Sequence, residues 1–268
     1  MLKRVFIGLL GLCFFIFLAC VVSQRFVVNL ITAFAACIIL LELYRAVGLD
    51  KNPALCILGL SVAVSCILAG QFGCNFLTFT VSVYAFLLFV IYILLYGRIS
   101  FTDLSESFFV TVFVSLFVLS AVSVRYMRMG DFLIWYLAIG AWITDTFAYF
   151  SGRFFGKHKM TLISPKKTWE GFAGGVAGCV VSLLVYSACI CELANVRVNY
   201  YAVTGFAILC SFVAQFGDLC ASAIKREYKI KDYGTKLPGH GGLMDRVDSF
   251  LFAAPFAFAF FNLFPVIS

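Results

Sequence analysis

The sequence predicts an all-α, polytopic integral membrane protein with about nine transmembrane helices and a cytoplasmic N-terminus. Three observations support this fold class. Hydrophobic residues make up 63% of the chain and charged residues only 12%, the apolar residues form runs of membrane-spanning length, and the cations between these runs are distributed unevenly. A soluble domain usually carries about 25% charged residues. A soluble globule of 268 residues would not bury this much apolar surface.

The apolar runs give the positions of the helices. A transmembrane helix needs about 20 apolar residues to cross about 30 Å of hydrocarbon. Nine runs meet or approach this length: 5–22, 26–48, 55–71, 76–97, 107–124, 132–151, 172–194, 201–224 and 248–267. The first run follows two cations, as in a signal peptide, but we interpret it as an uncleaved helix because more spans follow.

The cations between the runs predict the orientation. With the N-terminus in the cytoplasm, sixteen of the 20 lysines and arginines fall in cytoplasmic segments, and the exceptions are Arg25, Arg125, Arg128 and Arg197. This is the positive-inside pattern. We therefore expect a multi-pass protein of a bacterial-type inner membrane, with its active site cytoplasmic. The same bias and anionic lipids explain the net charge of +7, and no basic arm or RNA-binding pattern points to nucleic acid.

The ionisable residues divide the chain into two parts. Residues 1–131, with about five helices, carry few of them inside the spans, and we expect the main one, Glu42, to pair with Arg45 three residues later. Residues 132–268, with about four helices and two cytoplasmic loops, form the predicted catalytic region. The eleven cysteines are scattered without CxxC spacing and are interpreted as packing residues.

Asp218, Ser222, Lys225 and Lys229 share one face of the eighth predicted span, because helical neighbours are three or four residues apart. A carboxylate at membrane depth then lies below a hydroxyl and two ammonium groups. The alternative interpretation is a salt-bridged helix end with snorkelling lysines.

Asp245 and Asp248 are three residues apart at the start of the ninth span. They are interpreted either as a capping pair favoured by the helix dipole or as metal ligands. Together with Asp218 they supply three carboxylates from two helix ends. Such a set suits one or two divalent cations that also bridge phosphates.

The loop at 152–171 holds a second group of candidates. Ser164 followed by Pro165 is typical of a helix start, so Lys166 and Lys167 would lie where a helix N-terminus binds phosphate. The alternative is a basic loop that faces lipid headgroups. Asp145, inside the preceding apolar run, costs about 2.5–3.5 kcal/mol at membrane depth, so we expect a lysine, arginine or metal partner.

The turn Leu237-Pro-Gly-His-Gly-Gly242 lacks the spacing of a P-loop and is interpreted as a flexible anion nest. For His240 a role in acid–base chemistry, phosphate binding or structure stays open. The combination of Lys, Arg, Asp and Gly in 222–248 indicates phosphate chemistry at a membrane.

Residues 222–248 resemble the signature of the phosphatidate cytidylyltransferase family, also called CDP-diglyceride synthetases. The matching residues are Ser222, Lys225, Arg226, Lys231, Asp232, Gly234, Leu237, Pro238, His240, Gly241, Gly242, Asp245, Arg246 and Asp248. Asp145, Tyr149, Gly152 and 164–171 resemble the family's upstream stretch. The resemblance covers residues 140–265.

The resemblance implies that CTP and phosphatidate give CDP-diacylglycerol and pyrophosphate, with Mg²⁺ required. It also implies that the metal-site carboxylates are Asp218, Asp245 and Asp248. We expect Lys225, Arg226, Lys229 and Arg246 to hold the triphosphate, and Lys166 and Lys167 to hold lipid phosphate or CTP. The remaining expected substrate-binding residues are Ser164, Ser222, Lys231, Asp232, His240, Gly241, Gly242 and Asp145.

Two rival functions follow from the same residues. A transporter would also place acids inside spans, but it predicts polar residues deep in several spans and broken repeats in both halves, which the sequence does not show. A nearer rival transfers the nucleotide to another lipid or a polyprenyl phosphate. The sequence leaves the oligomeric state open, a homodimer included.

Overall fold

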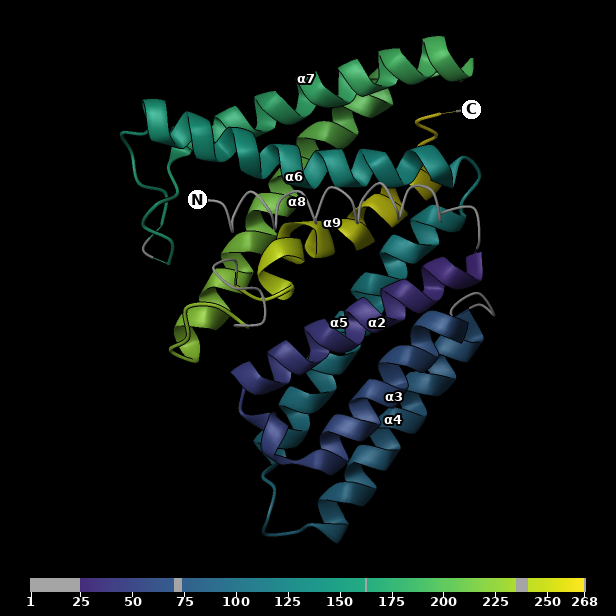
Figure 1. The fold of residues 1–268 in the computed structure, drawn as a ribbon, viewed down its shortest axis with the longest axis vertical. Coiled ribbons are helices and arrows are strands. Elements are labelled where there is room, and N and C mark those ends of the chain that lie inside the picture. Colours follow the sequence, from purple (N-terminus) through teal and green to yellow (C-terminus); the bar gives the residue numbers. More distant parts are fainter. Residues whose placement is uncertain (1–24, 70–73, 162, 235–240, 268) are drawn as a thin grey trace, which may run out of the picture. The chain divides into compact units, whose positions relative to one another are not determined.

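A computed structural model describes residues 25–69, 74–161, 163–234 and 241–267 of the chain. These residues form helices, with three isolated β-bridges and no sheet among them. The elements, labelled in Figure 1, are α2 (Arg25–Ala46), η1 (Leu49–Lys51), α3 (Pro53–Ala69), α4 (Cys74–Leu94), α5 (Phe101–Tyr126), α6 (Gly130–Phe155), α7 (Trp169–Ala194), α8 (Tyr200–Glu227) and α9 (Met244–Leu263). The predicted all-α class is confirmed.

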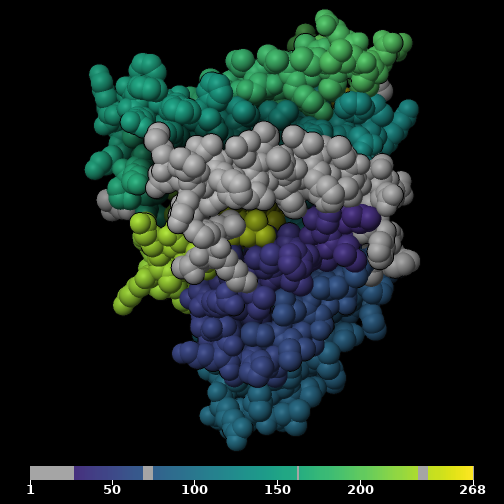
Figure 2. Space-filling model, viewed as in Figure 1, coloured from purple at the N-terminus to yellow at the C-terminus, as the bar shows by residue number. Residues whose placement is uncertain are grey.

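Seven of the described helices, all except α3, are long and apolar enough to cross a membrane. The α3 helix is apolar but has only 17 residues. The predicted first span, 5–22, lies outside the described residues, so the count of nine stays a prediction. Large apolar side chains of α4, such as Phe79, Phe86 and Ile93, are exposed. Exposed apolar side chains suit contact with lipid tails, and the α4 segment contributes to the blue part of the surface in Figure 2.

The chain divides into two compact units. Unit 1 comprises residues 1–119 and 232–244, and unit 2 comprises residues 120–231 and 245–268. The segment 232–244 therefore belongs with the N-terminal helices rather than with the helices that flank it in sequence. The division of function predicted at residues 131 and 132 stays a prediction.

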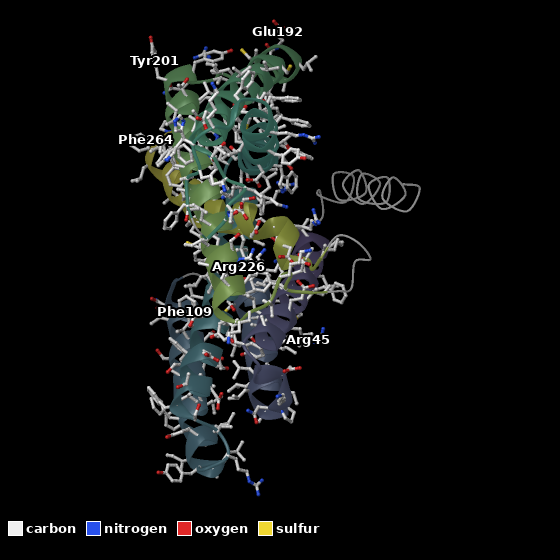
Figure 3. The ribbon with its side chains drawn as sticks, turned by 90° about the vertical axis from the view of Figure 1, so that its left-hand side faces the viewer. Arg45, Phe109, Glu192, Tyr201, Arg226 and Phe264 are labelled. Carbon is white, nitrogen blue, oxygen red and sulfur yellow. The ribbon has the colours of Figure 1, made fainter. Side chains whose placement is uncertain are left out.

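Unit 1 contains a buried carboxylate that differs from expectation. The predicted ion pair between Glu42 and Arg45 is wrong: Arg45, labelled on α2 in Figure 3, is exposed, whereas Glu42 is only 1% exposed. The Glu42 side chain instead accepts hydrogen bonds from the backbone N–H groups of Leu243 and Met244. Spacing along one helix could not predict a partner about 200 residues away.

In unit 2, α6 and α7 lie side by side (Figure 1), because α7 presents glycines to α6. A Cβ atom on Gly174 would collide with Ser151, and one on Gly178 would collide with the Phe147 ring. Small residues at an interface allow two membrane helices to approach closely. The α8 helix packs against both, and the close packing holds the ends of these helices in fixed positions.

Candidate active site

A cavity of about 340 Å³ lies within unit 2, where the ends of α6 and α8 meet the starts of α7 and α9. Its lining includes eight of the residues predicted from the sequence: Asp145, Ser164, Lys166, Lys167, Asp218, Lys225, Asp245 and Asp248. Four aspartates and three lysines therefore face one space. Its volume falls at the lower end of the usual range for small-molecule sites.

The loop before α7 positions two of the lysines. The predicted helix start at Ser164 and Pro165 is wrong, because α7 begins at Trp169 and its N-cap is Thr168, whose side chain accepts a hydrogen bond from the N–H of Gly171. Residues 158–161 and 163–168 instead belong to a loop whose two sides are joined by backbone hydrogen bonds, one of them from the N–H of Trp169 to the carbonyl of His158. The N–H of Met160 donates to the carbonyl of Lys167. The carbonyl of Lys167 therefore forms a hydrogen bond across the loop and not along a helix.

The end of α8 positions Asp218 and Lys225, which are seven residues apart and both line the cavity. The helix stops at Glu227, because Lys229 adopts a left-handed backbone and the N–H of Ile230 bonds to the carbonyl of Lys225. This is a Schellman ending. The predicted helical stripe is therefore wrong at Lys229, which lies beyond the helix. Arg226, at the opposite end of α8 from Tyr201 in Figure 3, is exposed.

Two ion pairs cross the cavity and join different elements. The ammonium group of Lys167, from the loop, lies 2.8 Å from Asp218 of α8 and also donates to the carbonyl of Gln215 at 2.9 Å. The ammonium group of Lys225 of α8 lies 2.8 Å from Asp245 of α9. The side chains of this second pair are 14% and 8% exposed, so water screens it weakly.

The other two aspartates share a serine. The hydroxyl of Ser249 donates to Asp145 at 2.6 Å, and the backbone N–H of Ser249 donates to Asp248 at 2.8 Å. Among the residues that the structure describes, neither aspartate has a lysine, arginine or histidine within ion-pair distance. The partner found for Asp145 among the described residues is thus a hydroxyl, and not the expected lysine or arginine; a metal partner stays a prediction.

These carboxylates allow a test of whether the site suits a divalent cation. Across the described residues, no three Asp, Glu, His or Cys side chains converge in an arrangement that could hold a metal ion. The chemistry of the donors nevertheless fits, since hard cations such as Mg²⁺ prefer carboxylate oxygens. Two acids of the cavity, Asp145 and Asp248, have hydrogen-bond donors but, among the described residues, no cation within ion-pair distance.

Comparison with known proteins identifies the family. The profile of the cytidylyltransferase family matches residues 2–264 of this chain. The chain belongs to the cytidylyltransferase family. It is 31% identical to a phosphatidate cytidylyltransferase of Bacillus subtilis, over 98% of both chains. It is also 40% identical over 124 residues to the phosphatidate cytidylyltransferase of Thermotoga maritima, and 41% identical over 121 residues to phosphatidate cytidylyltransferase 4, chloroplastic, of Arabidopsis thaliana.

These two shorter matches cover less than half of this member of the cytidylyltransferase family: 46% and 45% of its chain. They cover 46% of the Thermotoga protein and 30% of the Arabidopsis protein. Only the Bacillus relative among these three aligns along nearly its whole length. The assignment to the family therefore rests on the full-length matches.

Several predicted site residues of this cytidylyltransferase family member do not line the cavity. In unit 2 these are Ser222, Arg226, Lys229, Lys231 and Arg246, of which all except Ser222 are exposed. Three others, Asp232, Gly241 and Gly242, belong to unit 1. His240 lies outside the described residues. Direct roles for these residues stay predictions.

Two polar residues at the cytidylyltransferase cavity were not predicted from the sequence. Ser249 links two of the aspartates, and its only sequence signal was its position directly after Asp248. Gln215 lines the cavity, and its amide donates to the Phe172 carbonyl and to Ser211. The sequence signal for Gln215 was an amide side chain within an apolar run, three residues before Asp218.

Proposed function

We propose that this protein transfers a cytidylyl group from CTP to phosphatidate and releases pyrophosphate, forming CDP-diacylglycerol. The Bacillus subtilis relative that aligns over 98% of both chains is named a phosphatidate cytidylyltransferase, which supports this reaction. The observation that carries the proposal is the single cavity in which the lysine loop, the end of α8 and the start of α9 bring lysines and aspartates together.

In the proposed reaction a phosphate oxygen of phosphatidate attacks the α-phosphorus of CTP. The bond from this phosphorus to the bridging oxygen breaks, and pyrophosphate leaves with the electron pair. Because the attacking oxygen is already anionic, no side chain has to remove a proton. The protein's contribution is therefore to position the two phosphates and to neutralise their charge.

The lysines supply part of this neutralisation. Lys166 lines the cavity and is exposed, so its ammonium group can meet a phosphate from either substrate. Lys167 and Lys225 bind Asp218 and Asp245 in the structure. We propose that both ammonium groups donate to phosphate oxygens when CTP is bound, while the exposed Arg226, Lys229 and Arg246 attract the triphosphate from outside the cavity.

Mg²⁺ completes the proposed site. Asp218, Asp245 and Asp248 would hold one or two ions, and a bound ion would neutralise charge on the α-phosphate and on pyrophosphate. The carboxylate of Asp248, which forms no ion pair among the described residues, supports this assignment. Asp145 is coupled to Asp248 through Ser249 and would fix its orientation.

We also propose that the cavity opens to the cytoplasm of a bacterial-type cell. The C-terminal ends of α6 and α8 border the cavity, and the cation-rich segments follow these ends in the sequence. The positive-inside pattern supports a cytoplasmic position for them. Phosphatidate would then enter from the inner leaflet.

The proposal is tested by following phosphorus from CTP into lipid. Purified protein is incubated with CTP labelled at the α-phosphate, phosphatidate and Mg²⁺, and the lipid phase is counted. We expect label in lipid, none when the γ-phosphate carries the label instead, and loss of transfer on chelation that added Mg²⁺ restores. A panel containing phosphatidate, lysophosphatidate and a polyprenyl phosphate tests the acceptor. Preference for the polyprenyl phosphate, or no transfer to any acceptor, would contradict the assignment.

A further inference from the structure

The carboxylate of Glu42 binds the N-terminus of the helix that carries two of the proposed metal ligands. Its Oε1 accepts the N–H of Leu243 at 3.0 Å, and its Oε2 accepts the N–H of Met244 at 2.9 Å. Both donors belong to unit 1, as Glu42 does. Met244 is the first residue of α9, so the carboxylate from α2 acts as the cap of another helix.

The N-terminus of α9 needs a hydrogen-bond acceptor from outside its own first turn. The first N–H groups of a helix lack partners within the helix, and they are usually satisfied by the side chain of the preceding residue. Leu243 precedes α9, and its side chain has no acceptor. A carboxylate is also the side chain that the positive end of the helix dipole favours most. Glu42 supplies both the acceptors and the charge.

Burial makes the contact costly to lose. Glu42 is 1% exposed, and among the described residues it forms no ion pair with any cation. A buried carboxylate without hydrogen bonds is strongly unfavourable in an apolar environment. The two N–H donors are therefore the partners that allow a charge at this position.

Gly234 and Gly242 of the signature, which have no side chains, provide the space that the Glu42 carboxylate occupies. A Cβ atom on Gly234 would lie 2.7 Å from Oε1 of Glu42, and one on Gly242 would collide with Oε2. The Cβ of Gly234 would also approach the Cα of Gly242 at 3.0 Å. Gly234 and Gly242 thus fit a carboxylate of the protein; the anion nest predicted for the turn 237–242 stays a prediction.

We infer that Glu42 is a positioning residue for the transfer reaction, an inference that rests on the proposed function. By fixing the backbone of Leu243 and Met244, it sets the start of α9. Asp245 and Asp248 are the second and fifth residues of this helix. A loosened first turn would displace Asp245 directly and would reduce turnover without removing any group that contacts substrate.

Glu42→Gln tests the inference in the purified full-length protein. Glutamine keeps the shape but replaces one acceptor with an N–H₂ donor and removes the charge. We expect the turnover number to fall about 10- to 100-fold, with the KM for CTP changed less than threefold. Glu42→Asp keeps the charge and should recover part of the turnover. Amide hydrogen exchange should accelerate at residues 243–248 in Glu42→Gln.

Asp103→Asn is the matched control. Asp103 also accepts a backbone N–H, from Ser100 at 2.7 Å, at the start of a helix of unit 1, and α5 carries no proposed site residue. Because this hydrogen bond is exposed, we expect Asp103→Asn to lower the thermal midpoint less than Glu42→Gln does and to leave turnover within twofold. Equal losses of turnover in both variants, or unchanged turnover in Glu42→Gln, would overturn the inference. The exchange measurement needs no substrate, so accelerated exchange combined with an inactive wild-type protein would instead count against the proposed reaction.

Discussion

Two polar clusters of this protein satisfy their polar groups in opposite ways. In unit 1, the hydroxyl of Tyr44 bonds to Ser107 at 2.9 Å and to Thr111 at 2.6 Å, and the hydroxyl of Tyr84 bonds to the same two residues. All four side chains are uncharged and fully buried. In unit 2, the cluster consists of charged groups that line a cavity, and two of its aspartates have no cation within ion-pair distance among the described residues.

The difference separates a structural polar cluster from a chemical one. Hydroxyl groups can both donate and accept, so four of them close a network without help from water or ligand. Carboxylates only accept hydrogen bonds and carry charge, so several of them facing one cavity repel one another unless cations lie among them. In this chain, therefore, the uncharged cluster should control stability and the charged cluster should control turnover.

Asp248→Asn should give the largest effect on turnover. We expect transfer from CTP to fall about 10²- to 10³-fold or more, the range for loss of one group that stabilises transition-state charge. Asparagine retains an oxygen that can accept the N–H of Ser249, and the change removes a buried carboxylate that forms no ion pair among the described residues. The thermal midpoint in detergent should therefore not fall. The α-labelled CTP assay and a thermal melt measure the two quantities.

The control for this variant is Asp131→Asn. Asp131 belongs to the same unit and pairs with Arg125, but it is exposed and does not line the cavity. Its replacement should leave turnover within twofold. Wild-type turnover in Asp248→Asn would remove this residue from the metal site, and an equal loss in Asp131→Asn would show that the assay responds to charge in general.

Replacing Lys225 should give the next largest effect, and replacing its neighbour Arg226 provides the control. Lys225→Ala removes the partner of Asp245 inside the cavity. A hydrogen bond to a charged group contributes about 1.5–3 kcal/mol, so we expect kcat/KM to fall about 10- to 100-fold. Arg226 is exposed and does not line the cavity.

Arg226→Ala should therefore act only through long-range attraction of the nucleotide. We expect its KM for CTP to rise about two- to fivefold at low salt and to match the wild type at 1 M salt, where the Debye length is about 3 Å. Kinetics at two salt concentrations test both variants. An effect of Arg226→Ala as large as that of Lys225→Ala, and insensitive to salt, would place Arg226 in contact with substrate.

Much of the fold was predictable because the bilayer imposes one length scale on every span. The eight predicted runs that fall on described residues coincide with α2 to α9, but several helices begin earlier than predicted. The α5 helix starts at Phe101 rather than 107, where Ser100 and Asp103 cap each other. The α9 helix starts at Met244 rather than 248, where Glu42 caps it. Hydropathy locates a span but does not locate the polar cap that extends it.

The sequence predicted many of the residues that line the site, but it did not predict which of these side chains bind one another. Lysines, aspartates and glycines of the signature indicated phosphate chemistry, and eight predicted residues line one cavity. However, the pair of Lys167 with Asp218 and the link of Asp145 to Ser249 join residues about 50 and 100 positions apart. Such contacts depend on how α6 to α9 pack, and periodicity along one helix carries no information about them.

Tyr84→Phe should give the smallest effect on turnover and completes the comparison from the structural side. The change deletes the hydroxyl that donates to the Ser107 carbonyl at 3.0 Å and to Thr111 at 2.9 Å, and it leaves the ring in place. Hydrogen bonds between membrane helices contribute about 0.5–2 kcal/mol each. We therefore expect a thermal midpoint lowered by a few degrees and turnover within twofold of the wild type, measured on the same preparation. A tenfold loss of turnover at an unchanged midpoint would instead mean that the uncharged cluster takes part in the reaction, and the proposed separation between the two clusters would fail.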